Sequence, residues 1–405
     1  MKCGLLGRHL AHSYSPQIHS FLGNYPYEIF EKEPEQLADF LNNGDFTGLN
    51  VTIPYKKSVI PYCTVLSDTA RALGAVNTIV RMGPGLLVGH NSDYFGFRSL
   101  LERTGLSVRG KKVLVLGSGG ASSTAVAVLK EQGASVVIIS RSGENNYQNL
   151  HLHRDTTLIV NTTPVGMYPN TEEAPLSLAV FPRLEGVIDV IYNPAKTRLL
   201  LEAEARGLVA ENGLWMLVAQ AWESAQWFTG KSLSEGLIEA IYRTLKNQME
   251  NIVLIGMPGC GKSTIGHFLA QNLQRKFVDA DAQIVKESGM SIPEIFATQG
   301  ESAFRALESQ VLARLGKESG LIIATGGGCV TREENFTHLR QNGRLIWLTR
   351  SLDRLSIEGR PLSQITTMAD MYATREPLYR KFAHITVSND GTPAETIDQI
   401  LEAIQ

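Results

Sequence analysis

The chain has 405 residues, of which 43% are hydrophobic and 19% charged, so it is long enough for two or three domains with buried cores and too apolar for a disordered chain. Its formal net charge of −2 at pH 7 gives no electrostatic reason to expect binding to nucleic acid or to an anionic membrane. The four cysteines lie far apart without metal-ligand spacing, which predicts free thiols in a reducing cytoplasm. We expect neither a signal peptide nor a membrane span.

A turn near the N-terminus offers hydroxyl groups. The segment AHSYSP, residues 11–16, carries Ser13 and Ser15 on a turn that Pro16 constrains. Hydroxyls and backbone amides on a turn can hold a carboxylate, although such a segment alone is more often an ordinary turn. The two serines are therefore candidate ligand contacts only in the company of other polar residues.

Three further polar residues follow, each beside a predicted strand or helix. Lys56 comes after the strand predicted within GLNVTIPYKK, which should end at Pro54. Asn77 lies in GAVNTIV, and Asp93 lies in GHNSDYFG. Taken singly, they would be a surface lysine, a turn former and a helix cap.

A strand–helix–strand unit with glycines at its first turn begins at residue 111. Residues 111–117 (KKVLVLG) predict a buried strand, residues 121–133 a helix and residues 134–140 the next strand. The turn GSGGAS would let a pyrophosphate approach the amides at the helix N-terminus. The second strand ends in IISRS, where Arg141 replaces the acidic residue typical of NAD sites and suits the 2′-phosphate of NADP. A tight turn and a solvated arginine are the ordinary alternatives.

A second strand–loop–helix unit begins at residue 251. The strand NIVLIG leads into GMPGCGKS, which matches the phosphate-loop pattern G-x-x-x-x-G-K-[ST] over residues 256–263. In this pattern backbone amides cradle the phosphates, Lys262 reaches the β- and γ-phosphates and Ser263 ligates Mg²⁺. The pattern indicates a nucleotide site, and an ATPase, a GTPase switch and a small-molecule kinase all have it. The helix that follows should bury a stripe made of Ile265, Phe268, Leu269 and Leu273.

Carboxylates, glycines and arginines follow the phosphate loop. KFVDADAQIV places Asp279 and Asp281 at a strand end, where one can reach the metal's waters and the other an acceptor hydroxyl. ATGGGCV, residues 324–330, predicts a strand ending in three glycines that permit close backbone approach. The segments GESAFRALE, EGRPLS and TREPLYRKFA carry Arg305, Arg360 and Arg375. Isolated arginines are solvated by default, and the polar stretch around EGRPLS suggests a lid.

The motifs of the first 245 residues, taken together, resemble shikimate dehydrogenase. They are HSYSP, NVTIPYK, GAVNT, NSDYFG, GSGGAS, NTTPVGM and NGLWMLVAQA, in this order. The resemblance implies NADP-dependent interconversion of 3-dehydroshikimate and shikimate, with Lys56 and Asp93 as the catalytic pair. The implied substrate contacts are Ser13, Ser15, Thr52, Asn77, Tyr192 and Gln220. The implied cofactor contacts are Gly117, Ser118, Gly119, Gly120, Ala121, Ser140, Arg141 and Gly213. ASSTAV lacks an arginine that family members often carry after the glycines, which leaves the strength of the NADP preference open.

Residues 251–390 resemble shikimate kinase. The resemblance implies phosphoryl transfer from ATP to the 3-hydroxyl of shikimate, with Lys262 and Asp281 as catalytic residues. The implied ATP contacts are Gly259, Cys260, Gly261, Lys262, Ser263, Thr264 and Arg360, the last on the lid. The implied shikimate contacts are Asp281, Arg305, Gly327 and Arg375, and the implied Mg²⁺ contacts are Ser263 and Asp279.

The sequence thus predicts an α/β protein in three parts. Residues 1–95 form a substrate domain completed by helices from about 214–248, residues 96–213 a Rossmann-like NADP domain, and residues 251–405 a P-loop kinase domain with a parallel sheet. The predicted function is a bifunctional cytoplasmic enzyme that reduces 3-dehydroshikimate with NADPH and phosphorylates the resulting shikimate with ATP and Mg²⁺. We expect these small molecules as its partners, not nucleic acid or a membrane, and the oligomeric state cannot be read from the sequence. Two alternatives stay open: a first half that oxidises quinate or another cyclohexane carboxylate, and a half that only binds or scaffolds.

Overall fold

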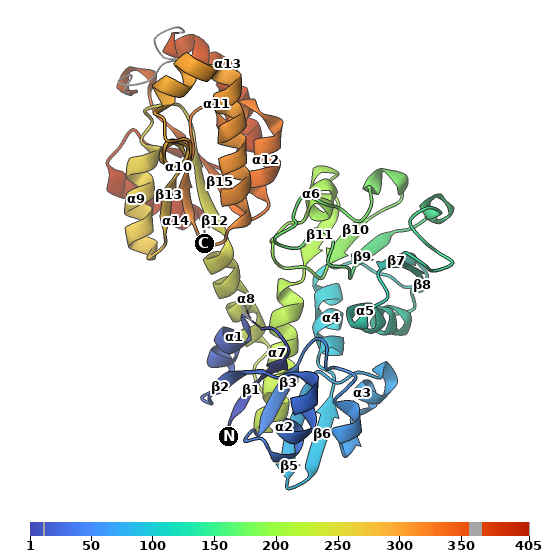
Figure 1. Ribbon diagram of the computed structural model, residues 1–405. Helices are drawn as coiled ribbons and strands as arrows, with labels where there is room; N and C mark the ends of the chain where they lie inside the picture. Colours follow the sequence, from blue (N-terminus) through green and yellow to red (C-terminus); the bar gives the residue numbers. More distant parts are fainter. Residues whose placement is uncertain (11–12, 356–366, 405) are drawn as a thin grey trace. The chain divides into compact units, whose positions relative to one another are not determined.

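The computed structural model describes residues 1–10, 13–355 and 367–404 (Figure 1). The chain divides into two compact units. Unit 1 contains Met1–Met167, Glu172–Tyr192 and Leu199–Leu245, and unit 2 contains Tyr168–Thr171, Asn193–Arg198 and Lys246–Gln405. Each unit has its own buried apolar core. None of the helices in the described ranges combines the length and the apolar character that a membrane crossing requires.

The first sheet of unit 1 has six strands in the order β2-β1-β3-β5-β6-β4. They are β1 Cys3–Gly7, β2 Tyr27–Glu31, β3 Gly48–Val51, β4 Val65–Leu66, β5 Thr78–Gly83 and β6 Leu86–His90. Strand β5 runs antiparallel to β3 and β6, and the other pairs are parallel. The helices α1 Ser15–Leu22, α2 Leu37–Asn43 and α3 Asp68–Leu73 connect these strands.

The strand expected to end at Pro54 ends three residues earlier, at Val51. The backbone turns immediately afterwards, because the Tyr55 amide donates to the Thr52 carbonyl oxygen at 2.9 Å. The turn takes Thr52 and Lys56 out of the sheet, so that both are free to line a cavity beyond the strand's carboxyl end.

The second sheet of unit 1 is parallel, in the order β11-β10-β9-β7-β8. Its strands are β7 Lys112–Leu116, β8 Ser135–Ile139, β9 Leu158–Asn161, β10 Gly186–Asp189 and β11 Val209–Asn212. The helices that accompany these strands are α4 Asp93–Arg103, α5 Gly120–Glu131, α6 Arg198–Ala205 and α7 Leu214–Thr229, and α8 Gly236–Met249 then continues past the end of unit 1 at Leu245. The chain goes from β7 to β8 on one side and then to β9 on the other, so strand order reverses at β7. Open α/β sheets bind ligands at the carboxyl ends of strands where such a reversal occurs.

Helix α7 ties the first sheet to the helices that flank the second. It lies against α4, α1 and β5. A Cβ added at Gly96 of α4 would lie 2.8 Å from the Met216 carbonyl oxygen of α7, so glycine permits the close approach of these two helices. Residues of α7 can therefore contact polar side chains from both parts of unit 1.

Unit 2 has one parallel sheet in the order β13-β14-β12-β15-β16. Its strands are β12 Asn251–Ile255, β13 Phe277–Asp279, β14 Ile322–Ala324, β15 Gly343–Thr349 and β16 Ile385–Ser388. Its helices are α9 Lys262–Leu273, α10 Ala280–Ser288, α11 Ile292–Lys317, α12 Glu333–Arg340, α13 Met368–Phe382 and α14 Pro393–Ile404. Figure 1 shows α9 and α11 on opposite sides of this sheet. The predicted α/β fold class is confirmed.

The prediction that Phe268 of α9 is a core residue is wrong. Phe268 is 44% exposed, whereas Ile265 and Leu269 are buried as expected. The buried arc continues through Gly266 and Ala270. Phe268 falls outside this arc because each residue advances the helix by about 100°.

Candidate active sites

A cavity of about 400 Å³ in unit 1 brings together most of the residues predicted for the first half. All eight predicted catalytic and substrate-contacting residues line it, namely Ser13, Ser15, Thr52, Lys56, Asn77, Asp93, Tyr192 and Gln220. Ala121 and Gly213, from the predicted cofactor contacts, line it as well. Thr52 follows β3 of the first sheet and Tyr192 follows β10 of the second, so the cavity lies between the two sheets of unit 1.

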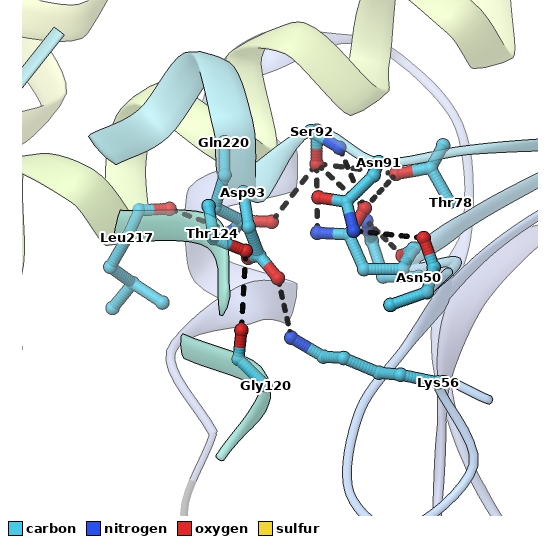
Figure 2. A network of polar contacts seen from close by, with 12 residues as sticks. Asn50, Lys56, Thr78, Asn91, Ser92, Asp93, Gly120, Thr124, Leu217 and Gln220 are labelled. Carbon is cyan, nitrogen blue, oxygen red and sulfur yellow. Dashed lines mark hydrogen bonds and ion pairs between the residues drawn. The ribbon is translucent and has the colours of Figure 1, made fainter. Parts of the chain in front are cut away.

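The central feature of the cavity is an ion pair. Lys56 Nζ donates to Asp93 Oδ2 at 2.6 Å, and Figure 2 shows the two side chains pointing toward each other. Both are partly exposed to the cavity, with side-chain exposures of 29% and 15%. Asp93 is the first residue of α4, where the helix dipole favours a negative charge. The arrangement presents a charged N–H donor held in place by a carboxylate.

Amide and phenol groups surround this pair. Asn77 Oδ1 accepts from the Ser92 amide at 2.7 Å. This contact fixes the orientation of the Asn77 side-chain amide. Gln220 Nε2 donates to the Leu217 carbonyl oxygen at 2.8 Å. Burial, with a smaller effect from Tyr14, raises the pKa of Tyr192, so its phenol stays a neutral hydrogen-bonding group. The cavity therefore carries several uncharged groups suited to hydroxyls of a small ligand.

The glycine turn after β7 has the form of a dinucleotide site. Gly117 has φ +107°, and a Cβ there would lie 2.8 Å from Thr162 Oγ1. A Cβ added at Gly119 or Gly120, where α5 begins, would meet no atom within 4 Å, so the helix N-terminus is open to a ligand. Backbone amides on an open helix N-terminus bind phosphate groups. The turn therefore fits the pyrophosphate of NADP.

The remaining predicted cofactor contacts lie around this turn. Ser118 lies within it, and Ser140 and Arg141 directly follow β8, with Arg141 exposed. A Cβ at Gly213 would lie 2.0 Å from the Val190 carbonyl oxygen, so only glycine fits there. An exposed arginine at the end of β8 leaves its guanidinium available to a phosphate.

The phosphate loop of unit 2 follows β12. Lys262 Nζ donates to the carbonyl oxygens of Gly256 and Met257 at 2.8 and 2.9 Å, so the loop closes around the ammonium group. Asn389 Nδ2 holds the loop from outside through the Cys260 carbonyl oxygen at 2.7 Å. Within the loop Gly256, Gly259 and Gly261 have positive φ angles. Thr264, also predicted to contact ATP, lies in the first turn of α9.

A hydroxyl and a carboxylate lie together beside this loop. Ser263 Oγ donates to Asp279 Oδ2 at 2.6 Å. The other oxygen of Asp279 caps α10 by accepting from the amides of Asp281 and Ala282. Hard oxygen donors of this kind are the ligands that Mg²⁺ prefers. The residues therefore fit a nucleotide triphosphate with its magnesium ion.

Two carboxylates, of which Glu308 is fully buried and Asp281 partly exposed, converge on the glycine turn after β14. A Cβ at Gly326 would lie 2.5 Å from Glu308 Oε1 and 2.8 Å from Asp281 Oδ1. Among the described residues neither oxygen has a hydrogen-bond partner. Burial, together with the negative charges of Glu308 and Asp279, raises the pKa of Asp281 to about 6. Asp281 is therefore an acceptor for a proton near neutral pH.

Two arginines face the same turn. Arg305 Nη1 donates to Glu308 Oε2 at 2.7 Å, and a Cβ at Gly328 would overlap its guanidinium. Arg375 Nη1 donates to the Gly327 carbonyl oxygen at 3.3 Å. The two side chains are 7% and 8% exposed. Buried guanidinium groups that meet at one point suit a ligand carboxylate, which they can bind with charge-assisted hydrogen bonds.

Comparison with known proteins bears first on unit 1. Residues 5–79 match the family model described as "Shikimate dehydrogenase substrate binding domain". The shikimate dehydrogenase (NADP(+)) of Clostridium perfringens is 34% identical over 265 residues, which cover 60% of this chain and 97% of the relative. The chain belongs to the shikimate dehydrogenase family. Residues 258–405 match the family model described as "Shikimate kinase". The chain thus joins a shikimate dehydrogenase part to a shikimate kinase domain.

Solved structures resemble the shikimate dehydrogenase part. The shikimate 5-dehydrogenase of Thermus thermophilus, solved in complex with NADP(H) and shikimate, has 30% identity and a TM-score of 0.55, covering 60% of this chain and 99% of that one. The quinate dehydrogenase of Corynebacterium glutamicum, solved in complex with NAD, has 25% identity and a TM-score of 0.56, covering 60% of this chain and 98% of that one.

Several lining residues of the dehydrogenase cavity were not predicted. They are Leu5, His9, Leu10, Asn50, Val51, Val190, Met216 and Leu217. Asn50 was detectable, because it lies in the motif NVTIPYK two residues before Thr52. The apolar residues read as ordinary core positions and carried no signal of their own.

In the kinase domain the prediction missed Glu308. It lies three residues after Arg305 on one helix face, so a buried ion pair at this spacing could have been inferred. Burial raises the pKa of the Glu308 carboxyl although Arg305 lies beside it. The predicted lid arginine, Arg360, lies outside the described residues.

Proposed function

We propose that this chain catalyses two consecutive reactions on one small carboxylate. The first half reduces 3-dehydroshikimate to shikimate with NADPH, and the second transfers a phosphoryl group from ATP to the 3-hydroxyl of shikimate. The observation that carries the proposal is that polar groups suited to each reaction lie together in each half. The Lys56–Asp93 pair lies in the unit 1 cavity, and Asp281 lies with the two arginines beside the phosphate loop of unit 2.

In the dehydrogenase half the protein supplies the proton that the substrate's carbonyl oxygen gains on reduction. NADPH, when bound, supplies the hydride to the carbonyl carbon. Lys56 donates a proton to the carbonyl oxygen and stabilises the negative charge that develops there. Asp93 holds the ammonium group in position through its 2.6 Å contact. The carboxylate and hydroxyls of the substrate are bound by the remaining predicted contacts, namely Ser13, Ser15, Thr52, Asn77, Tyr192 and Gln220.

In the kinase half the residues neutralise charge and orient the acceptor. ATP and Mg²⁺, when bound, supply the phosphoryl group and its counter-charge. Arg305 and Arg375 bind the shikimate carboxylate, while Asp281 orients the 3-hydroxyl and accepts its proton. Lys262 neutralises negative charge on the phosphates, and Arg360 is proposed to assist it. Positioning of the reactants and electrostatic stabilisation provide most of the catalysis in phosphoryl transfer.

The remaining parts of the proposal concern organisation. We assign residues 1–95 with the helices from about 214–248 to the substrate domain, residues 96–213 to the NADP domain and residues 251–405 to the kinase domain. We also propose a cytoplasmic location. In support, the four cysteines, all in the part of the chain that the structure describes, carry free thiols.

The test is a single reaction followed by two signals. The protein is incubated with 3-dehydroshikimate, NADPH, ATP and Mg²⁺, while NADPH absorbance and ADP release are recorded together. ADP that rises only as NADPH is consumed supports both activities in sequence. Consumption of NADPH without ADP would refute the kinase assignment, and no change in either signal would refute both.

A second assay addresses the open alternative for the first half. The oxidation of shikimate and of quinate is compared with NADP⁺ and with NAD⁺. We expect shikimate with NADP⁺ to give the highest kcat/KM. A higher kcat/KM on quinate would favour the activity named for the structurally similar quinate dehydrogenase.

A further inference from the structure

A buried cluster of polar side chains beside the dehydrogenase cavity has one serine at its centre. Ser224 lies on α7, one turn after Gln220, and has no exposed surface. Its Oγ lies 2.8 Å from Asn50 Nδ2, 2.9 Å from Thr78 Oγ1 and 2.9 Å from Ser92 Oγ. Figure 2 shows Asn50, Thr78 and Ser92 converging in this network. Four segments of the chain therefore meet at a single hydroxyl.

The neighbours of Asn50 settle which way its amide faces. Its Nδ2 reaches the Asn77 carbonyl oxygen at 3.5 Å, and a carbonyl oxygen can only accept. Its Oδ1 accepts from the Tyr27 hydroxyl at 2.7 Å. The nitrogen therefore faces Ser224, whose Oγ accepts the bond from Asn50. Without that hydroxyl, one N–H of a buried amide loses its partner, which is costly in a protein interior.

The neighbours of Ser92 lead to the same hydroxyl. Ser92 occupies the N-cap position of α4, yet its side chain makes no capping hydrogen bond. Instead its Oγ contacts Ser224 Oγ at 2.9 Å and accepts from Asn77 Nδ2 at 3.0 Å. Serine at an N-cap ordinarily satisfies a helix amide. Here the Ser92 side chain instead fixes Asn77, which lines the cavity. The residue after Ser92 is Asp93, which also lines the cavity.

The contacts of Ser224 with α7 itself do not explain its presence. Its hydroxyl is within 2.9 Å of the Gln220 carbonyl oxygen, a back-bond that does little for helix stability. An alanine would suit a fully buried helix face, since Ala221 and Ala225 already lie there. A buried hydroxyl in contact with three polar side chains instead imposes one arrangement on them.

We propose that Ser224 is a positioning residue for the dehydrogenase reaction. Its hydroxyl fixes the side chains of Asn50 and Ser92, and through Ser92 it fixes Asn77. Asn50 Oδ1 and Asn77 Nδ2, on two residues that line the cavity, therefore keep fixed positions toward the substrate hydroxyls. Ser224 is not among the described residues that line the cavity, so it acts through these neighbours. The inference rests on the proposed dehydrogenase function.

The test compares Ser224→Ala with a matched control in the full-length chain. Thr229→Val is the control, because Thr229 Oγ1 makes the same type of back-bond on α7, to the Ala225 carbonyl oxygen at 2.8 Å, away from the cavity. In Ser224→Ala we expect the KM for shikimate to rise roughly tenfold, as for a buried group that loses its hydrogen-bond partner. The KM for NADP⁺ and the kinase rate of the same chain should stay unchanged. Thr229→Val should alter none of these values.

Two results with Ser224→Ala would overturn the assignment. One is a shikimate KM within twofold of the wild type, and the other is an equal rise in both KM values, which indicates general loosening. If Ser224→Ala does not fold, Ser224→Cys retains a weak acceptor and should give an intermediate KM, and an unchanged KM would count against the proposal. In a cycle with Asn50→Ala, the two effects should be less than additive, and full additivity would refute the coupling. A wild type that does not turn over shikimate refutes the proposed function instead, before any variant is compared.

Discussion

The Lys56 ammonium donates to Asp93 at 2.6 Å inside the unit 1 cavity, whereas the next residue, Lys57, is exposed. Replacing Lys56 by alanine removes the proposed proton donor and should leave the sheet and the glycine turn in place. We expect kcat for 3-dehydroshikimate reduction to fall by roughly 10²–10⁴-fold. Lys57→Ala provides the control and should keep full activity. Unchanged reduction by Lys56→Ala would mean that this half uses another acid or only binds its ligand.

We expect Asp281 to make the kinase activity sensitive to pH. Burial, then the charges of Glu308 and Asp279, raise its pKa from an ordinary value of 3.8 to about 6. The proposed role requires the ionised carboxylate, so kinase kcat/KM should fall tenfold per pH unit below about pH 6. An activity profile from pH 5 to 8 at saturating ATP measures this acid limb. A limb near pH 4 would show that Asp281 is not desolvated in the working enzyme.

The same shift has a consequence for stability. A carboxyl with a higher pKa in the folded than in the unfolded chain binds more protons when folded, so its contribution to stability is lost as pH rises from about 4 to about 6. Asp281→Asn abolishes this loss. The melting temperature of the variant should therefore exceed that of the wild type at pH 8, and the difference should shrink toward pH 4. A difference independent of pH would contradict the shift.

At the scale of elements, helix α11 depends on one glycine. Gly300 interrupts the helix with φ 83° and ψ 172°, a conformation that residues with a Cβ adopt only at a cost of roughly 1–3 kcal/mol. Space is no obstacle, because a Cβ there would meet nothing within 4 Å. The kink precedes Arg305 by little more than one turn, so it sets the direction of the segment that carries the proposed carboxylate clamp.

We therefore expect Gly300→Ala to lower the stability of unit 2 and raise the kinase KM for shikimate. The dehydrogenase rate of the same chain should not change. Ser302→Ala is the matched control, since Ser302 is exposed in the same helix and alanine is the best helix former. Melting curves and the two activity assays test both statements. A variant with wild-type stability would show that α11 tolerates a straight path at residue 300.

The elements themselves were largely accessible from the sequence, because hydrophobic runs and glycine turns are local signals. The strands β7, β8 and β12 and the helices α5 and α9 lie where the patterns indicate. What could not be predicted depends on distant contacts. The sequence AWESAQW reads as part of a buried helix, and nothing in it marks Ser224 as a meeting point for Asn50 and Ser92. The early end of β3 likewise depends on the turn in which the Tyr55 amide donates to the Thr52 carbonyl oxygen. The residue types in this segment do not show where that turn begins.

At the scale of the whole molecule, the described residues of each proposed site belong to one unit. The residues lining the dehydrogenase cavity all belong to unit 1, and the phosphate loop with Asp281 and the two arginines belongs to unit 2. The sequence indicated two nucleotide sites through two separate glycine motifs, but only the resemblance of each half to a known family connected them through shikimate. We therefore expect neither reaction to require residues of the other unit.

This separation predicts the behaviour of a mixture. Lys56→Ala should carry out only the kinase reaction and Lys262→Ala only the reduction, so neither variant alone should convert 3-dehydroshikimate to the phosphorylated product. An equimolar mixture, with each intact site at its wild-type concentration, should reach the wild-type rate of ADP release after a lag in which free shikimate accumulates. Joining the sites raises the local concentration of shikimate, so the wild type should show a shorter lag and the same final rate. A wild type that releases ADP without any lag, while the mixture shows one, would show that shikimate passes between the two sites of one chain without equilibrating with solvent, and equal lags would contradict the effect of joining the sites.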